Sequence, residues 1–274
     1  MIDEFLTHGL SDVEEAVRKA AAVEIMPRFR QLAEHEVDEK SGPHDLVTVA
    51  DRKAEEHLTA SLRRLLPGSA VVGEEAVHAD PTVYGALRAD APVWIVDPVD
   101  GTRQFVQGDP AFCTLVALAH RGEILASWTF APALEEMATA VRGQGAFVGG
   151  ERISSGAPQP GAELRVATAH PFYTSEHDKR TLARLDVPGI VARACGSAGL
   201  EYLRVARGEM DALAFTWPSA WDHAAGLLLV AEAGGAQSTV DGVPFRVDRD
   251  NALPFAVGRD EATTVRIRSL LRGE

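Results

Sequence analysis

Two carboxylates flank a Pro-Val pair directly after an apolar run, in the stretch WIVDPVDGT at residues 94–102. One acid would suffice to end a strand, so Asp97 and Asp100 call for another explanation. Pro98 has no N–H for a strand ladder, and we therefore expect the chain to turn there and both acids to face one cavity. With the Val99 carbonyl, four residues would supply three oxygens, the ligand type that Mg²⁺ prefers. The stretch predicts a divalent-cation site.

The next residues predict an anion site beside that cation site. Gly101 lets the backbone pass close to a ligand. Thr102 is expected to cap a short helix that begins near residue 103, and the free N–H groups at such a helix start attract phosphate.

Further acids stand at the ends of other expected elements. Glu74 and Glu75 follow a short apolar strand, Asp222 lies in the first turn of an apolar helix, and Asp51 lies near a helix start. Each has a local alternative: a solvated loop, a capping box with Ser219, or a favourable helix N-terminus. If they cluster, however, like charges about 4 Å apart repel by several kcal/mol, so the cluster predicts bound metal.

Hydrophobic periodicity indicates the elements that must position these acids. Helices are expected over residues 13–32, 48–66, 175–185, 196–208, 220–235 and 260–272, and strands over 70–75, 93–98, 112–119, 124–130, 137–141, 164–170, 210–217 and 253–258. Pro27 should kink the first helix. The Gly-, Pro- and Ser-rich segment 154–163 predicts a boundary between an N-terminal α+β half (1–160) and a C-terminal α/β half (161–274).

Composition narrows the function classes. The chain has 274 residues, is 46% hydrophobic and carries a formal net charge of −13, which argues against nucleic-acid polymers and anionic membranes as partners. No apolar run reaches the roughly 18 residues of a membrane span. The N-terminus lacks the pattern of a signal peptide, and two distant cysteines, Cys113 and Cys195, favour free thiols; we therefore expect a cytoplasmic protein.

Over essentially its full length the sequence resembles the inositol monophosphatase family of Mg²⁺-dependent, lithium-sensitive phosphomonoesterases. Four motifs carry the resemblance: DLVTVAD (45–51), GEE (73–75), DPVDGT (97–102) and WDHAAG (221–226). The third and fourth together are highly specific. The resemblance implies a layered αβαβα sandwich of the inositol monophosphatase and fructose-1,6-bisphosphatase type, an active site between the two halves, and a homodimer.

The resemblance also implies roles for the matched residues, in a site that uses two to three Mg²⁺ ions. The implied metal ligands are Glu74, Asp97, Val99 through its carbonyl, Asp100 and Asp222. Asp51 and Thr102 would orient and deprotonate the attacking water, with Glu75 in support, and Lys40 would border the site. The implied substrate contacts are Glu74, Val99, Asp100, Gly101, Thr102, Gly196, Ser197, Ala198, Phe215 and Asp222. Metals of this kind activate water and stabilise the leaving oxygen of an in-line displacement.

The sequence departs from the family where substrate is selected. Phe215 stands where inositol-hydrolysing members carry a glutamate that contacts polyol hydroxyls, and an apolar ring cannot accept those hydrogen bonds. Phe215 and Trp217 could instead stack on a flat or apolar group. Histidinol phosphate, fructose 1,6-bisphosphate and 3'-phosphoadenosine phosphates are substrates of relatives and remain open.

Two other classes compete with this interpretation. The haloacid-dehalogenase-like motif D-x-D-G-T has one residue between its acids, whereas two residues, Pro98 and Val99, intervene here. A non-catalytic, metal-dependent sugar-phosphate binding protein would bind ligand without turnover. Every matched metal-binding and water-activating position is filled, which favours the enzyme.

Overall fold

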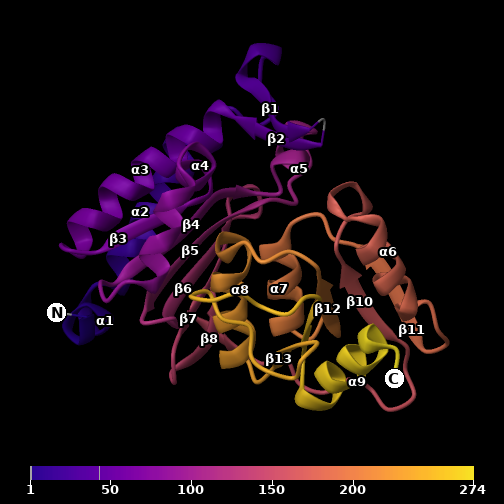
Figure 1. The fold of residues 1–274 in the computed structure, drawn as a ribbon. Helices are drawn as coiled ribbons and strands as arrows, with labels where there is room; N and C mark the ends of the chain where they lie inside the picture. Colours follow the sequence, from indigo (N-terminus) through magenta and orange to yellow (C-terminus); the bar gives the residue numbers. More distant parts are fainter. Residues whose placement is uncertain (1, 43) are drawn as a thin grey trace.

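Helices and β-sheets alternate in five layers in the computed structural model, which describes residues 2–42 and 44–274 (Figure 1). In order, the layers are α1 to α3, a seven-stranded sheet, α7 and α8, a five-stranded sheet, and α6 with α9. This is the expected αβαβα sandwich.

The seven-stranded sheet has the order β3-β4-β5-β6-β7-β8-β9. Its strands are β3 (Ala70–Gly73), β4 (Val93–Asp100), β5 (Cys113–His120), β6 (Glu123–Ala131), β7 (Glu136–Val141), β8 (Gly145–Val148) and β9 (Glu151–Ile153). Strands β3 and β4 are parallel and the other neighbours antiparallel. Every residue of β4 is buried, because helices cover both faces of the sheet.

The first helical layer packs on the outer face of this sheet. It consists of α1 (Ile2–His8), α2 (Leu10–Ala20) with a π-helical turn (Ala21–Ile25), and α3 (Val49–Leu65). Val17, Leu58 and Leu62 meet Trp94 and Val116 of the sheet in one core. The helix expected to kink at Pro27 instead ends before it, because proline has no N–H to continue the helical ladder.

The central layer joins the two sheets. Helices α7 (Ala198–Ala206) and α8 (Ala220–Glu232) lie between the seven-stranded sheet and a five-stranded sheet of order β11-β10-β12-β14-β13. The strands of that second sheet are β10 (Leu164–Thr168), β11 (Ile190–Ala194), β12 (Ala212–Phe215), β13 (Ala236–Thr239) and β14 (Phe255–Gly258). Helices α6 (Glu176–Leu182) and α9 (Glu261–Arg272) cover its far face. Residues 154–163 form no regular element between the two sheets.

Short elements surround the acids. The helix expected near residue 103 is α5 (Thr102–Val106). The hairpin β1 (Val37–Gly42) and β2 (Asp45–Thr48), α4 (Glu74–Ala79) and the 3₁₀ helix Pro81–Arg88 were not expected from the sequence. Within the described part of the chain, none of the helices has both the length and the apolar character needed to cross a membrane.

Candidate active site

The DPVD stretch does not leave its strand at Pro98, contrary to expectation. β4 continues to Asp100 through an irregularity between Asp97 and Asp100, where the regular pairing with β5 shifts. Because a bulge leaves its residues out of the ladder, proline is tolerated there. Thr114 donates its hydroxyl to the freed Pro98 carbonyl at 2.8 Å. The irregularity changes the direction of the Asp97 and Asp100 side chains without ending the strand.

Three carboxylates converge beside this irregularity. Asp97, Asp100 and Asp222 each offer an oxygen, and these oxygens lie within 4.8 Å of one another. Asp222 comes from the first turn of α8. Burial, reinforced by the charge of Glu74 and of Asp100, raises the pKa of Asp97 well above its ordinary value. For Asp222, burial followed by the charges of Asp100 and Glu74 does the same. The cluster therefore concentrates like charge in a buried place.

The alternative role for Asp222, a capping box with Ser219, is not what the structure shows. Ser219 occupies the N-cap position of α8 without a capping bond from its side chain. Asp222 instead accepts a hydrogen bond from the indole Nε1 of Trp217 at 3.0 Å. Asp222 thus offers an oxygen to the cluster while the side chains of Trp217 and Ser219, which precede α8, hydrogen-bond to its carboxylate.

The start of α7 holds Asp100 in place. Asp100 accepts hydrogen bonds from the Ser197 hydroxyl at 2.6 Å and from the backbone N–H groups of Gly199 and Ala198 at 2.7 and 3.1 Å. Burial raises the pKa of Asp100, although these donors oppose the rise. Ser197, expected to contact substrate, is only 3% exposed, and its hydroxyl is engaged with Asp100.

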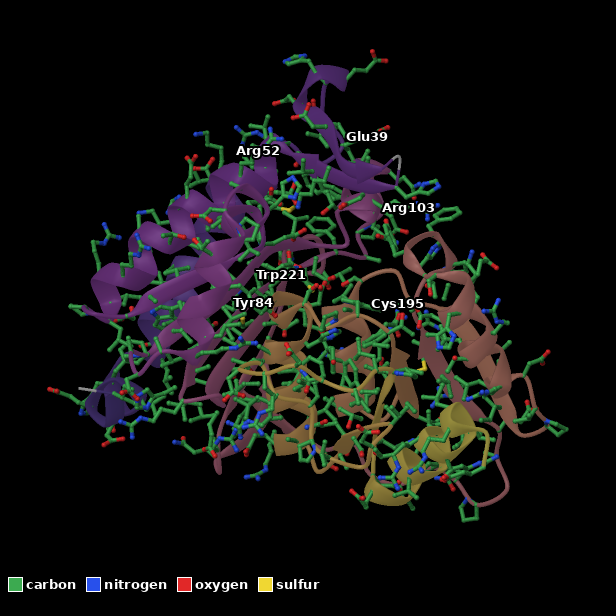
Figure 2. The ribbon with its side chains drawn as sticks, viewed as in Figure 1. Glu39, Arg52, Tyr84, Arg103, Cys195 and Trp221 are labelled. Atoms are coloured by element: carbon green, nitrogen blue, oxygen red, sulfur yellow. The ribbon has the colours of Figure 1, made fainter. Side chains whose placement is uncertain are left out.

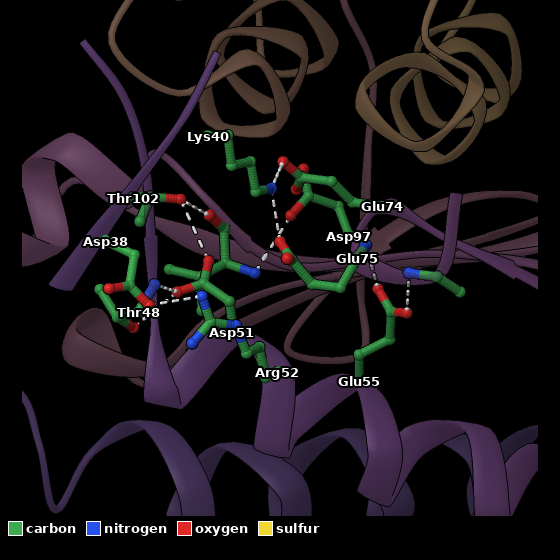
Figure 3. Close-up of polar contacts among 12 residues, drawn as sticks. Asp38, Lys40, Thr48, Asp51, Arg52, Glu55, Glu74, Glu75, Asp97 and Thr102 are labelled. Carbon is green, nitrogen blue, oxygen red and sulfur yellow. Dashed lines mark hydrogen bonds and ion pairs between the residues drawn. The ribbon is translucent and has the colours of Figure 1, made fainter. Parts of the chain in front are cut away.

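Glu74 and Glu75 open α4 and share one cation. The Lys40 ammonium contacts both carboxylates (Figure 3) and lies 2.7 Å from Glu74 Oε1 and 2.5 Å from Glu75 Oε1. Burial alone would lower the pKa of Lys40, but the two carboxylates outweigh it and raise that pKa above its ordinary value. Lys40 reaches them from β1, so the hairpin β1–β2 borders the site, as the resemblance implied for Lys40.

Glu55 is a site residue that sequence reasoning missed. From α3 it accepts the backbone N–H groups of Glu75 and Ala76, each at 2.8 Å, and so holds the start of α4 (Figure 3). A Cβ at Gly73 would collide with the Glu55 carboxyl group, which explains the glycine before the two glutamates. The available signal was spacing: Glu55 follows Asp51 by four residues and therefore shares its helix face.

Asp51 and Thr102 meet across 51 residues of sequence. The Thr102 hydroxyl lies 3.1 Å from Asp51 Oδ1 and 2.9 Å from the Val99 carbonyl oxygen. Asp51 Oδ2 accepts the Thr48 N–H at 2.8 Å and its hydroxyl at 2.6 Å, in a capping box that starts α3. Burial raises the pKa of Asp51 to about 7 despite the Thr48 bonds. The prediction that Thr102 caps α5 is wrong. Gly101, with φ of 90°, occupies the N-cap position, and Thr102 is the first helical residue.

A cavity of about 600 Å³ opens over these groups. Several residues that the sequence analysis assigned to the site line this cavity: Lys40, Glu74, Asp97, Val99, Asp100, Gly101, Thr102, Gly196, Ala198, Trp217 and Asp222. Phe215 does not line it: the ring is fully buried and packs against Tyr202, His223 and Phe255.

Two groups of aromatic and cationic residues at the cavity were not expected from the sequence. On one side are Trp221 and its neighbour Tyr84, whose rings meet edge to face at 5.9 Å (Figure 2). On the other are His44, Arg103, His170 and Tyr173, which line the cavity near residue 102. These residues come together at the cavity from segments that are distant in sequence, so no local sequence pattern predicts their position there.

Comparison with known proteins agrees with this geometry. A model of the inositol monophosphatase family matches residues 8–267. An inositol-1-monophosphatase of Rhizobium meliloti is 40% identical over 204 residues, covering 73% of this chain and 74% of that protein. The solved structure of the extragenic suppressor protein suhB of Bartonella henselae superposes with a TM-score of 0.81 at 28% identity, covering 96% and 98% of the two chains.

A Thermotoga maritima IMPase structure gives a TM-score of 0.77 at 27% identity, covering 94% of each chain. The family is metal-dependent, which accords with the buried acidic cluster. The chain belongs to the inositol monophosphatase family and is a phosphoric monoester hydrolase.

Proposed function

We propose that this protein is a Mg²⁺-dependent phosphomonoesterase that hydrolyses a small phosphorylated alcohol with an activated water molecule. The observation that carries the proposal is the convergence of Asp97, Asp100 and Asp222 in the floor of a cavity that Thr102 also lines. The acids come from β4 and α8, which belong to different layers of the fold.

The donor set fits Mg²⁺. Carboxylate oxygens are the ligands of hard divalent cations, and buried acids with raised pKa values gain most from a cation. We assign Asp97, Asp100 and Asp222 to this role, joined by Glu74 and the Val99 carbonyl. Two to three divalent cations, when bound, would lower the pKa of water and stabilise the leaving oxygen.

Thr102 and Asp51 are our candidates for holding the attacking water. The Thr102 hydroxyl is within hydrogen-bond reach of Asp51 Oδ1, and Thr102 lines the cavity while Asp51 lies buried behind it. Thr102 can orient a water through its hydroxyl, and the Asp51 carboxylate can receive a proton through it. The first N–H groups of α5 offer donors to the phosphate.

The cavity suits a small molecule rather than a polymer, since small-molecule sites commonly measure about 300–1,000 Å³. Inositol phosphates, sugar phosphates, histidinol phosphate and 3'-phosphoadenosine phosphates all remain candidates. Trp217, rather than the buried Phe215, is the aromatic side chain from that stretch that we assign to substrate contact.

A phosphate-release screen over inositol, sugar, histidinol and nucleotide monophosphates tests the proposal, with Mg²⁺, with EDTA, and with Mg²⁺ plus Li⁺. We expect release from one class with Mg²⁺, inhibition by Li⁺, and loss with EDTA. Asp222→Asn is the matched inactive control. Calorimetric binding of those phosphates without release would establish the non-catalytic binding protein instead.

Two further properties are proposals of the same kind. A homodimer follows from the resemblance, and light scattering after gel filtration measures it. A reducing, cytoplasmic compartment is supported by Cys113 and Cys195, which are both buried and free.

A further inference from the structure

We infer that the cavity contains a second anion subsite, formed by Arg103 and His170, which selects substrates with a carboxylate or second phosphate besides the phosphate that is released. The inference rests on the proposed phosphatase function and adds the class of its substrate. Both residues line the cavity that holds the acidic cluster. Arg103 directly follows Thr102 and both residues line this cavity, so one small molecule can contact both.

Each ring nitrogen of His170 faces a donor. The Phe172 backbone N–H donates to His170 Nδ1 at 3.2 Å, at the start of the short helix Pro171–Tyr173. Burial, together with the charges of Arg103 and His44, lowers the pKa of His170, which favours the neutral ring. A neutral imidazole that accepts at Nδ1 carries its proton on Nε2.

That assignment brings two donors face to face. Nη1 of Arg103 lies 3.3 Å from His170 Nε2, and a guanidinium nitrogen can only donate. The opposite tautomer would merely move the same conflict to the Phe172 N–H. An oxyanion bound beside these two nitrogens would remove the conflict, because one oxygen can accept hydrogen bonds from both. The guanidinium of Arg103 contacts the rings of His170 and Phe172.

The surrounding rings hold Arg103 ready. Its guanidinium carbon lies 4.7 Å from the centre of the Phe172 ring, and His44 stacks on the same ring at 3.9 Å. The Tyr173 hydroxyl donates to the His44 carbonyl at 2.6 Å, which ties the residue before β2 to the segment before α6. Figure 2 shows Arg103 between these two parts of the chain. A guanidinium stacked in this way loses little freedom when an anion binds.

Matched substrate pairs test the subsite, because their members differ only in the second anion. Glycerol 2-phosphate and 2-phosphoglycerate differ by a carboxylate, and glucose 1-phosphate and glucose 1,6-bisphosphate by a phosphate. For at least one pair we expect wild-type kcat/KM to favour the charged member, and Arg103→Ala to lower that ratio at least about tenfold, the range of a lost charge-assisted hydrogen bond. The pair affected identifies the anion.

Two variants serve as controls. Arg103→Lys keeps the charge without the planar fork, and we expect an intermediate ratio. Arg180→Ala removes an exposed arginine of α6 that does not line the cavity, and the ratio should stay at the wild-type value. Equal losses for charged and neutral members, an Arg103→Ala ratio equal to wild type, or the same fall with Arg180→Ala would each overturn the subsite.

A binding measurement separates this inference from the proposed function. On an Asp51→Asn background, calorimetry should show the charged member of the pair binding at least about tenfold more tightly, and Arg103→Ala should remove the difference. If wild type releases phosphate from no substrate, the phosphatase proposal fails while this measurement still decides the subsite. Equal affinities for both members of each pair would refute it.

Discussion

Glu55 accepts the backbone N–H of Glu75 at 2.8 Å, from a position 20 residues earlier in the chain. The second oxygen of the same carboxylate accepts the N–H of Ala76. Burial raises the pKa of Glu55 to about 7, although both N–H groups oppose the rise. Glu55 thus joins the helix that carries Asp51 to the turn that carries Glu74 and Glu75, and it acts as a positioning residue.

Replacing Glu55 should loosen that turn. In Glu55→Gln, the amide NH₂ would face one of the two backbone donors, and a buried donor left without an acceptor costs about 1–3 kcal/mol of unfolding free energy. We expect a loss of that size in urea melts and a higher Mg²⁺ concentration for half-maximal activity. Glu56→Gln, on the exposed side of the same helix, should change stability by less than about 0.5 kcal/mol. Identical behaviour of the two variants would contradict the positioning role.

Asp97→Asn should remove function without weakening the metal-free fold. The Val99 N–H donates to Asp97 Oδ1 at 3.1 Å, and an asparagine oxygen can accept the same bond. Removing one carboxylate also relieves repulsion from Glu74 and Asp100. In EDTA we expect a Tm equal to or above wild type, with no rise on adding Mg²⁺ and no phosphate release. A Mg²⁺-dependent rise in Tm equal to that of wild type would disprove the ligand assignment.

Thr102→Ala should reduce turnover far more than metal affinity. The variant loses the hydroxyl beside Asp51 but no proposed metal-binding oxygen. General-base catalysis contributes roughly 10²–10⁴-fold, so we expect kcat to fall at least about 100-fold while the Mg²⁺ dependence changes little. Thr102→Ser keeps the hydroxyl and should recover most of the loss. Parallel falls in kcat and Mg²⁺ affinity would instead indicate damage to the metal site.

The metal-free protein should lose stability as pH rises through the Asp51 titration. The folded-state pKa of about 7 exceeds the ordinary 3.8, so between these values the folded state binds more protons and the free energy of unfolding falls with increasing pH. In EDTA, Asp51→Asn should therefore show a smaller drop in Tm than wild type between pH 5 and pH 8.

His223 changes stability with pH in the opposite direction to Asp51, so the pH profile of wild type must be compared with that of Asp51→Asn. Burial lowers the pKa of His223 from 6.5 to about 3, so its contribution to stability is lost as pH falls below 6.5. Because His223 is the same in wild type and Asp51→Asn, its effect cancels in the difference between the two pH profiles. Parallel Tm profiles would show that Asp51 does not titrate in this range.

The sequence by itself determined the main secondary-structure elements and the chemistry of the acids in the floor of the cavity. Period-2 and period-3.6 patterns located the main strands and long helices, because burial on one or two faces is written into the order of apolar residues. Asp97, Asp100 and Asp222 were predicted to share a site, and the structure brings them within 4.8 Å. Their residue types alone specified oxygen ligands for a hard cation.

Tertiary structure decided the walls and supports of the site, because these depend on which distant segments meet. Glu55 and Gly73 support the site only because α3 packs against the start of α4 in the folded protein. Ser197 hydrogen-bonds to Asp100 because α7 begins beside that carboxylate. Phe215 is buried in the core, whereas Trp217 lines the cavity. Tertiary packing decides which of the two rings faces the cavity, and the spacing of residues in the sequence does not.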